Sequence, residues 1–198
     1  MGLYYIRFAD DLVACFQYRR DGEAFQRALE QRLERFSLTL HPAKTRLIEF
    51  GRFARENRQK RGLGKPESFD FLGFTHVCAQ RRSDGGFTVR RFTVAERQRA
   101  KLKEIRQWLM YHRNLPVAAQ GQRLARVILG AMNYYSVPGN LKALNAFRTE
   151  ICKSWFRALR RRSQKAAKLT WDKFKRIVRQ WIPSIRVIHP YPNERLRV

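Results

Sequence analysis

Acidic residues, cysteines and long apolar runs are all scarce in this sequence, and each shortage excludes a class of protein. There are 16 Asp/Glu against 42 Lys/Arg, which gives a formal net charge of +26 and a pI near 11.3. Such an excess exceeds what solubility needs and favours a polyanionic partner such as nucleic acid. No run of 18 apolar residues occurs, so we expect no transmembrane helix.

The three cysteines are Cys15, Cys78 and Cys152, which are far apart and form no C-x-x-C pair. This pattern excludes a disulfide framework and fits a reducing compartment, with each thiol a small buried apolar group. The N-terminus lacks a basic segment followed by an apolar one, so we expect no signal peptide. The four histidines show no metal-ligand spacing.

The residues that are present indicate a folded protein with an uneven distribution of charge. Apolar residues make up 44% and aromatic residues 13% of the chain, which is too much for a disordered tail. Residues 1–50 hold 8 Lys/Arg and 7 Asp/Glu, whereas residues 51–198 hold 34 and 9. This split predicts chemistry at one end of the chain and polyanion binding over the remainder.

The first fifty residues predict a small α+β layer with a helix packed on a sheet. Residues 3–8 and 12–17 are β-branched and aromatic runs, which predict a hairpin with Asp10 and Asp11 at its turn. Asp21 and Gly22 predict a turn, with Asp21 capping a helix whose apolar stripe runs from 25 to 40. Residues 45–50 predict a further strand.

The middle of the chain predicts a basic loop followed by two strands. Residues 51–66 carry six Lys/Arg with several glycines, which fits either a phosphate-contacting loop or a merely solvated one. Residues 69–80 and 87–92 predict strands joined by a turn at 84–86.

From Thr93 onward the apolar periodicity predicts helices. Thr93 and Glu96 have the spacing of a capping box, and Thr170 is placed to cap a short last helix. Between the helix expected to start at Thr93 and the last helix, the stripes predict two more helices. One runs from Pro116 to 135, and the other runs from 141 through the basic residues near 160. The four tryptophans lie on the apolar stripes of these helices, so core packing is expected of them more than base stacking.

Adjacent carboxylates on a strand–turn–strand can hold a hard cation. Mg²⁺ takes oxygen ligands, usually one or two carboxylates together with substrate phosphates, and two such ions can support phosphoryl transfer. A bare Asp-Asp pair is common in surface turns, so the dipeptide alone is a weak signal.

The context of the pair is more specific. Phe8-Ala9-Asp10-Asp11 resembles the catalytic motif of reverse transcriptases, usually Tyr-Ala-Asp-Asp. Later segments resemble, in order and over essentially the whole chain, elements of bacterial group II intron reverse transcriptase/maturases. These segments are 40–45 (LHPAKT), 69–74 (FDFLGF), 130–135 (GAMNYY), 155–165 (WFRALRRRSQK) with 170–171 (TW), and 189–192 (HPYP).

The resemblance implies catalytic roles for residues of the first half. Asp10 and Asp11 would be the catalytic carboxylates that ligate Mg²⁺. Lys44 would lie near the incoming triphosphate as a proton donor to the pyrophosphate leaving group. A solvated surface lysine is the alternative.

Three further residues are implied to lie near the nucleotide and primer. Phe8 and Ala9 adjoin the carboxylates, and Phe8 replaces the usual tyrosine, so we expect altered nucleotide handling with metal binding kept. Gly73, which lacks a Cβ, would let the backbone approach the primer closely, unless it simply marks a strand bulge.

The resemblance also implies a surface for structured RNA, because a maturase holds its intron through phosphates and shape. The RNA-binding candidates are Arg157, Arg160, Arg161, Arg162, Lys165 and Lys168. The alternative is a merely solvated basic surface.

The fold implied is α+β, with a partial palm over residues 1–92 and an all-helical maturase thumb with a C-terminal tail over 93–198. Only nine residues precede Asp10, whereas the family carries fingers and another metal-binding aspartate there. We therefore expect half of a two-metal Mg²⁺ site, and a palm sheet short of neighbours.

The function implied is that of the C-terminal portion of a group II intron reverse transcriptase/maturase. It would assist splicing and, with a complete palm and fingers, RNA-templated DNA synthesis. The alternatives are an RNA-binding remnant, or a split-enzyme half without polymerase activity of its own. The expected partners are group II intron RNA, a DNA target or primer and a separate N-terminal half, with no membrane, in the bacterial cytoplasm.

Overall fold

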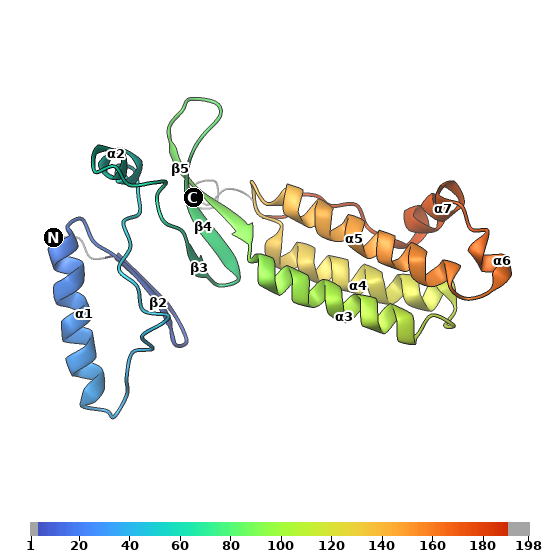
Figure 1. Cartoon of the computed structure of the whole chain (residues 1–198), viewed down its shortest axis with the longest axis horizontal. Helices are drawn as coiled ribbons and strands as arrows, with labels where there is room; N and C mark the ends of the chain where they lie inside the picture. The colour runs from blue at the N-terminus through green and yellow to red at the C-terminus, as the bar shows by residue number, and fades with distance from the viewer. Residues whose placement is uncertain (1–3, 190–198) are drawn as a thin grey trace, which may run out of the picture. The chain divides into compact units, whose positions relative to one another are not determined.

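The structure, a computed structural model, describes residues 4–189 and has the α+β class that the sequence predicts. The described residues form seven helices and two small antiparallel sheets (Figure 1). They divide into two compact units. Unit 1 comprises 4–71 and 77–89, and unit 2 comprises 72–76 and 90–189. No helix in the described part of the chain is long and apolar enough to cross a membrane.

Unit 1 begins with the predicted hairpin. Strands β1 (Tyr4–Phe8) and β2 (Asp11–Cys15) pair antiparallel, with Phe8 opposite Asp11, and leave a two-residue loop. Helix α1 (Arg19–Glu34) follows. It starts two residues before Asp21, so the predicted turn and cap at Asp21 are wrong: this carboxylate lies inside the first helical turn, where it suits the positive end of the helix dipole.

Two further predictions in unit 1 are wrong. The segment 45–50 is not a strand, and no strand of the described chain pairs with it. The Thr45 amide donates to the His41 carbonyl, and the Glu49 amide donates to the Glu67 carboxylate at 3.4 Å. The segment 51–66 is not all loop, since it contains the short helix α2 (Ala54–Lys60).

Side chains in unit 1 are poorly covered. Gly22 and Ala54 are its only buried residues among those described. The apolar side chains of β1 are open to solvent, with Tyr4 77% and Phe8 63% exposed. A two-stranded ribbon whose two faces are exposed to solvent gains little stability from packing. Its stability therefore depends on the turn and on local contacts.

The second sheet has the order β3 (Phe69–Phe71), β4 (Phe74–Gln80) and β5 (Phe87–Thr93). The predicted single strand over 69–80 is therefore wrong. It is broken by a two-residue turn in which Leu72 and Gly73 have φ of 47° and 76°. Positive φ at both central residues is what a tight hairpin of matching twist requires, and glycine adopts it without strain.

Unit 2 is built on three helices that run side by side: α3 (Ala95–Tyr111), α4 (Val117–Tyr135) and α5 (Leu141–Arg160) (Figure 1). Two shorter helices follow, α6 (Gln164–Ala167) and α7 (Trp171–Trp181). The predicted stripes meet in one core, and its fully buried members include Leu109, Ile128, Ile151, Trp155 and Phe174.

Two buried amides hold the helices of unit 2 in register. Gln120 donates to the carbonyl of His112 at 2.7 Å and accepts from the indole of Trp155 at 2.8 Å. Asn140 donates to Thr93 Oγ1 at 2.8 Å and to the carbonyl of Tyr135 at 2.9 Å, and its Oδ1 accepts from the Thr93 amide. The amides are thereby satisfied, as buried polar groups must be.

The Asn140 contact explains why the predicted capping box at Thr93 is wrong. Thr93 ends β5 and its hydroxyl is taken by Asn140, so α3 begins at Ala95 without a side-chain cap. The predicted cap at Thr170 is confirmed, since its hydroxyl accepts from the Lys173 amide at 3.4 Å.

Candidate functional site

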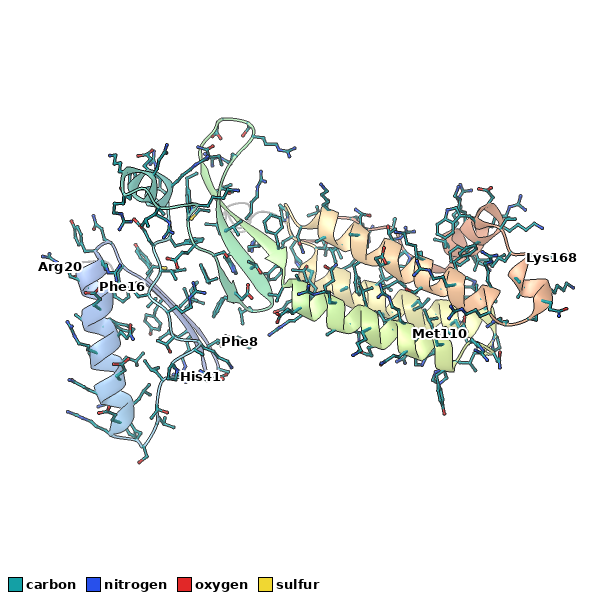
Figure 2. The ribbon with its side chains drawn as sticks, in the orientation of Figure 1. Phe8, Phe16, Arg20, His41, Met110 and Lys168 are labelled. Atoms are coloured by element: carbon teal, nitrogen blue, oxygen red, sulfur yellow. The ribbon has the colours of Figure 1, made fainter. Side chains whose placement is uncertain are left out.

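The two carboxylates of the sequence motif lie at the tip of the β1–β2 hairpin in unit 1. Ala9 and Asp10 form the loop, Asp11 is the first residue of β2, and all three are exposed. Ala9 takes a φ of 54°, and its carbonyl accepts from Arg7 Nε at 2.9 Å, which pins the turn. Figure 2 shows Phe8 at this tip, beside the loop.

The chemistry of this tip suits a hard cation, but the tip brings few ligands together. Two exposed carboxylates match the one or two that Mg²⁺ commonly takes when water and phosphate supply the rest. No group of three or more His, Cys, Asp or Glu within 4–189 could hold a metal ion. Lys44 is exposed in a turn of unit 1, and no ion pair joins it to Asp10 or Asp11.

Gly73 lies in unit 2, at a junction of three motif segments. The Tyr134 hydroxyl donates to the Leu72 carbonyl at 2.8 Å, and the Phe74 ring packs on Tyr134 and Tyr135. A Cβ on Gly73 would meet the Tyr135 hydroxyl at 3.0 Å. The positive φ of the turn and the close Tyr135 hydroxyl therefore explain why position 73 is a glycine.

The third segment at this junction is the chain end. The His189 ring nitrogen Nε2 lies 2.6 Å from the Asn133 carbonyl, and the His189 amide donates to the carbonyl of Ser136. The remaining motif residues, 190–192, lie outside the described residues.

The six predicted RNA-binding residues form what we call the cationic segment, which runs from the end of α5 through α6 to the start of α7. Its members are Arg157, Arg160, Arg161, Arg162, Lys165 and Lys168. Ser163 caps α6 by accepting from the Ala166 amide at 3.1 Å, so the turn between the helices is fixed locally. Figure 2 shows Lys168 at the far end of unit 2, beyond α6.

Two arginines of this segment are held against the protein. Arg160 donates to the Ala167 carbonyl at 3.0 Å and lies over the Phe156 ring at 5.5 Å. Arg162 donates to the Leu115 carbonyl and is half-buried, and this burial lowers the pKa of its guanidinium. Arg162 is thus the least available of the six for a ligand.

The other four members are exposed. No ion pair joins any member of the cationic segment to an acidic residue within 4–189. The reason is visible in the sequence, because no Asp or Glu occurs between Glu150 and Asp172. An unneutralised cluster on packed helices repels itself unless anions screen it, so a polyanion would relieve that repulsion.

The basic stretch of unit 1 differs in this respect. Arg58 and Arg46 pair with Glu67, and Arg61 pairs with Glu49. Two of the six Lys/Arg in 51–66, Arg58 and Arg61, are thereby engaged within the protein, whereas Arg46 precedes that segment.

The sequence-based expectation for Trp171 is wrong. Trp155 is fully buried and Trp108 and Trp181 are half-buried, as the apolar stripes predict, but Trp171 is 41% exposed. It is the first residue of α7, and its ring meets Phe156 edge-on at 5.0 Å. Trp171 and Phe156 line an open hollow of about 450 Å³ beside the cationic segment.

No protein-family model matches the chain, and no curated protein matches it either.

Proposed function

We propose that this chain binds structured RNA through the cationic segment, as the C-terminal portion of a group II intron reverse transcriptase/maturase that assists splicing. The observation that carries the proposal is the set of six cations on the packed helices of unit 2, none of which forms an ion pair with an acidic residue within 4–189. The motif order along the sequence supplies the kind of RNA.

Packing favours this role over a merely solvated surface. Arg157 and Arg160 alternate along α5 with buried residues that include Trp155, Ala158 and Leu159, so the backbone beneath these two cations is packed into the core. Cations held at set spacings can match phosphates of a folded RNA at little ordering cost. Binding through such contacts releases counterions and weakens as salt rises.

The proposal extends to the hairpin tip of unit 1. Asp10 and Asp11 would hold Mg²⁺ there, and the ion would supply charge neutralisation for phosphate oxygens in DNA synthesis when palm and fingers are complete. Arg7 holds the loop carbonyl of Ala9 and so positions the two carboxylates. Phe8 lies opposite Asp11 across the ribbon, and Lys44 offers a proton to a leaving group.

The test is the affinity of the purified chain for a folded group II intron RNA and for a length-matched RNA duplex, measured over a salt series. We expect tighter binding to the intron at physiological salt and a steep loss of affinity as salt rises. Equal affinity for both RNAs would reject the maturase role and leave only electrostatic RNA binding. Absence of binding, or binding insensitive to salt, would reject the proposal.

A further inference from the structure

Two adjoining hollows lie on one side of α5 in unit 2, and they share three lining residues: Phe156, Arg157 and Arg160. Arg161 and Ala167 also line the first hollow. Lys153 and Trp171 also line the second, which has a volume of about 450 Å³. No carboxylate lines either hollow. The lining of the site therefore combines aromatic and positively charged side chains.

The aromatic side chains are fixed before any ligand arrives. Trp171 meets Phe156 at 5.0 Å with an interplanar angle of 88°, and meets the fully buried Phe174 at 5.3 Å. Phe156 also contacts Phe174 at 5.2 Å. With these ring contacts Trp171 keeps 41% of its surface exposed.

The cations around the hollow differ in how strongly they are engaged. Arg157 makes no hydrogen bond or ion pair with another described residue, while Lys153 pairs with Glu150 at 2.9 Å. Arg160 uses one of its N–H donors within the protein, in the hydrogen bond to the Ala167 carbonyl. Guanidinium groups carry five N–H donors in a planar fork, so both arginines retain donors for a phosphate.

We infer that this hollow receives one unpaired base of the bound RNA, with the base against Trp171 and its phosphates at Arg157 and Arg160. A flat aromatic group that carries negative charge matches an aromatic wall with a cationic rim, and RNA is read by stacking of splayed-out bases on such side chains. Regular duplex presents its bases stacked inside and cannot offer one. This inference rests on the proposed RNA binding and names the feature of RNA that the site selects.

The experiment compares three RNA hairpins of one stem sequence: fully paired, with a single bulged adenosine, and with an abasic nucleotide at the bulge. The abasic bulge keeps the phosphates and the bend but lacks the base. The wild-type chain should bind the adenosine bulge about 10-fold tighter than the abasic bulge, which is within the range of one stacked base.

The variants assign that preference to the hollow. Trp171→Ala should remove it and leave binding to the paired hairpin unchanged, whereas Trp171→Phe should keep most of it. The matched control is Tyr111→Ala, which removes another exposed aromatic ring of unit 2, one that is 88% exposed, and should retain the preference. Unchanged thermal unfolding of each variant establishes that it is folded.

Several results would overturn the inference. Equal affinity of the wild type for the adenosine and abasic bulges would do so, as would a Trp171→Ala variant that keeps the preference. Failure of the proposed RNA binding can be told apart from failure of the hollow assignment. If the chain does not bind RNA, no hairpin binds in a salt-dependent manner, and both proposals are rejected.

Discussion

The indole Nε1–H of Trp155 donates to Oε1 of Gln120 at 2.8 Å, with both side chains fully buried in unit 2. Replacing Gln120 by Leu leaves the buried indole N–H without its acceptor, whereas the His112 carbonyl still accepts from the Leu115 amide and Arg113 is exposed. An unsatisfied buried group costs about 1–3 kcal/mol, so we expect a loss of about 1–3 kcal/mol in the free energy of unfolding.

Urea denaturation of unit 2 measures this loss, with Gln107→Leu as the matched control. Gln107 is exposed on α3, and its replacement should change stability by less than about 0.5 kcal/mol. A Gln120→Leu variant as stable as the control would contradict the role assigned to the buried amide.

The contact of Asn140 with Thr93 predicts energetic coupling between residues 47 positions apart in the sequence. The Asn140 amide ties the end of β5 to the start of α5, so Thr93→Val and Asn140→Ala should not be additive. We expect a coupling energy of about 1 kcal/mol from a double-mutant cycle on unfolding free energies. Additive effects would mean that the bond does not contribute to stability.

The three thiols should differ in reactivity. Burial raises the pKa of Cys152, so less of it is thiolate at any pH below that raised value, while Cys15 is exposed. Labelling with a disulfide reagent near pH 8 should modify Cys15 first and Cys152 only as fast as the protein unfolds. Cys15→Ser should abolish the fast phase, and mass-spectrometric detection of early labelling at Cys152 would refute the assignment.

The hairpin tip should bind divalent cations weakly through Asp10 and Asp11. Adding Mn²⁺ in place of Mg²⁺ should broaden the amide NMR signals around residues 9–12, and Asp10→Asn with Asp11→Asn should remove the effect. The comparison variant is Asp84→Asn. Asp84 lies in another turn of unit 1. Arg81 donates a hydrogen bond to its carboxylate and thereby lowers the pKa of Asp84. Broadening that survives the double substitution would remove the tip from the proposal.

The helices of unit 2 could be predicted from sequence because their signal is local. Apolar residues at steps of three and four placed Ile128, Ile151 and Phe174 on stripes that meet in one core. Thr170 could be recognised as the N-cap of α7 from its residue type and position. The cations of the candidate RNA surface were equally visible, since the stretch between Glu150 and Asp172 lacks acids.

The errors lie where a distant contact overrides a local pattern. Thr93 has capping-box spacing, but Asn140 takes its hydroxyl. Residues 45–50 have strand composition, but no partner strand pairs with them in the described chain. Trp171 continues an apolar stripe, yet its position at the first turn of α7 leaves it at the surface. The first two outcomes have no signal within a few residues, whereas the position of Trp171 directly after the Thr170 cap is a local signal of its exposure.

The proposed RNA binding requires the cationic segment of unit 2 to contact RNA phosphates. The decisive measurement is the salt dependence of RNA affinity for three proteins: the wild type, the double variant Arg161→Gln with Lys168→Gln, and the double variant Lys101→Gln with Lys175→Gln. The last two lysines are exposed but pair with Glu104 and Asp172, so both double variants remove two charges from surface residues. Loss of Arg161 and Lys168 should reduce the slope of log affinity against log salt by about 1–2, and the control should leave it nearly unchanged. Equal slopes for all three proteins would contradict the account.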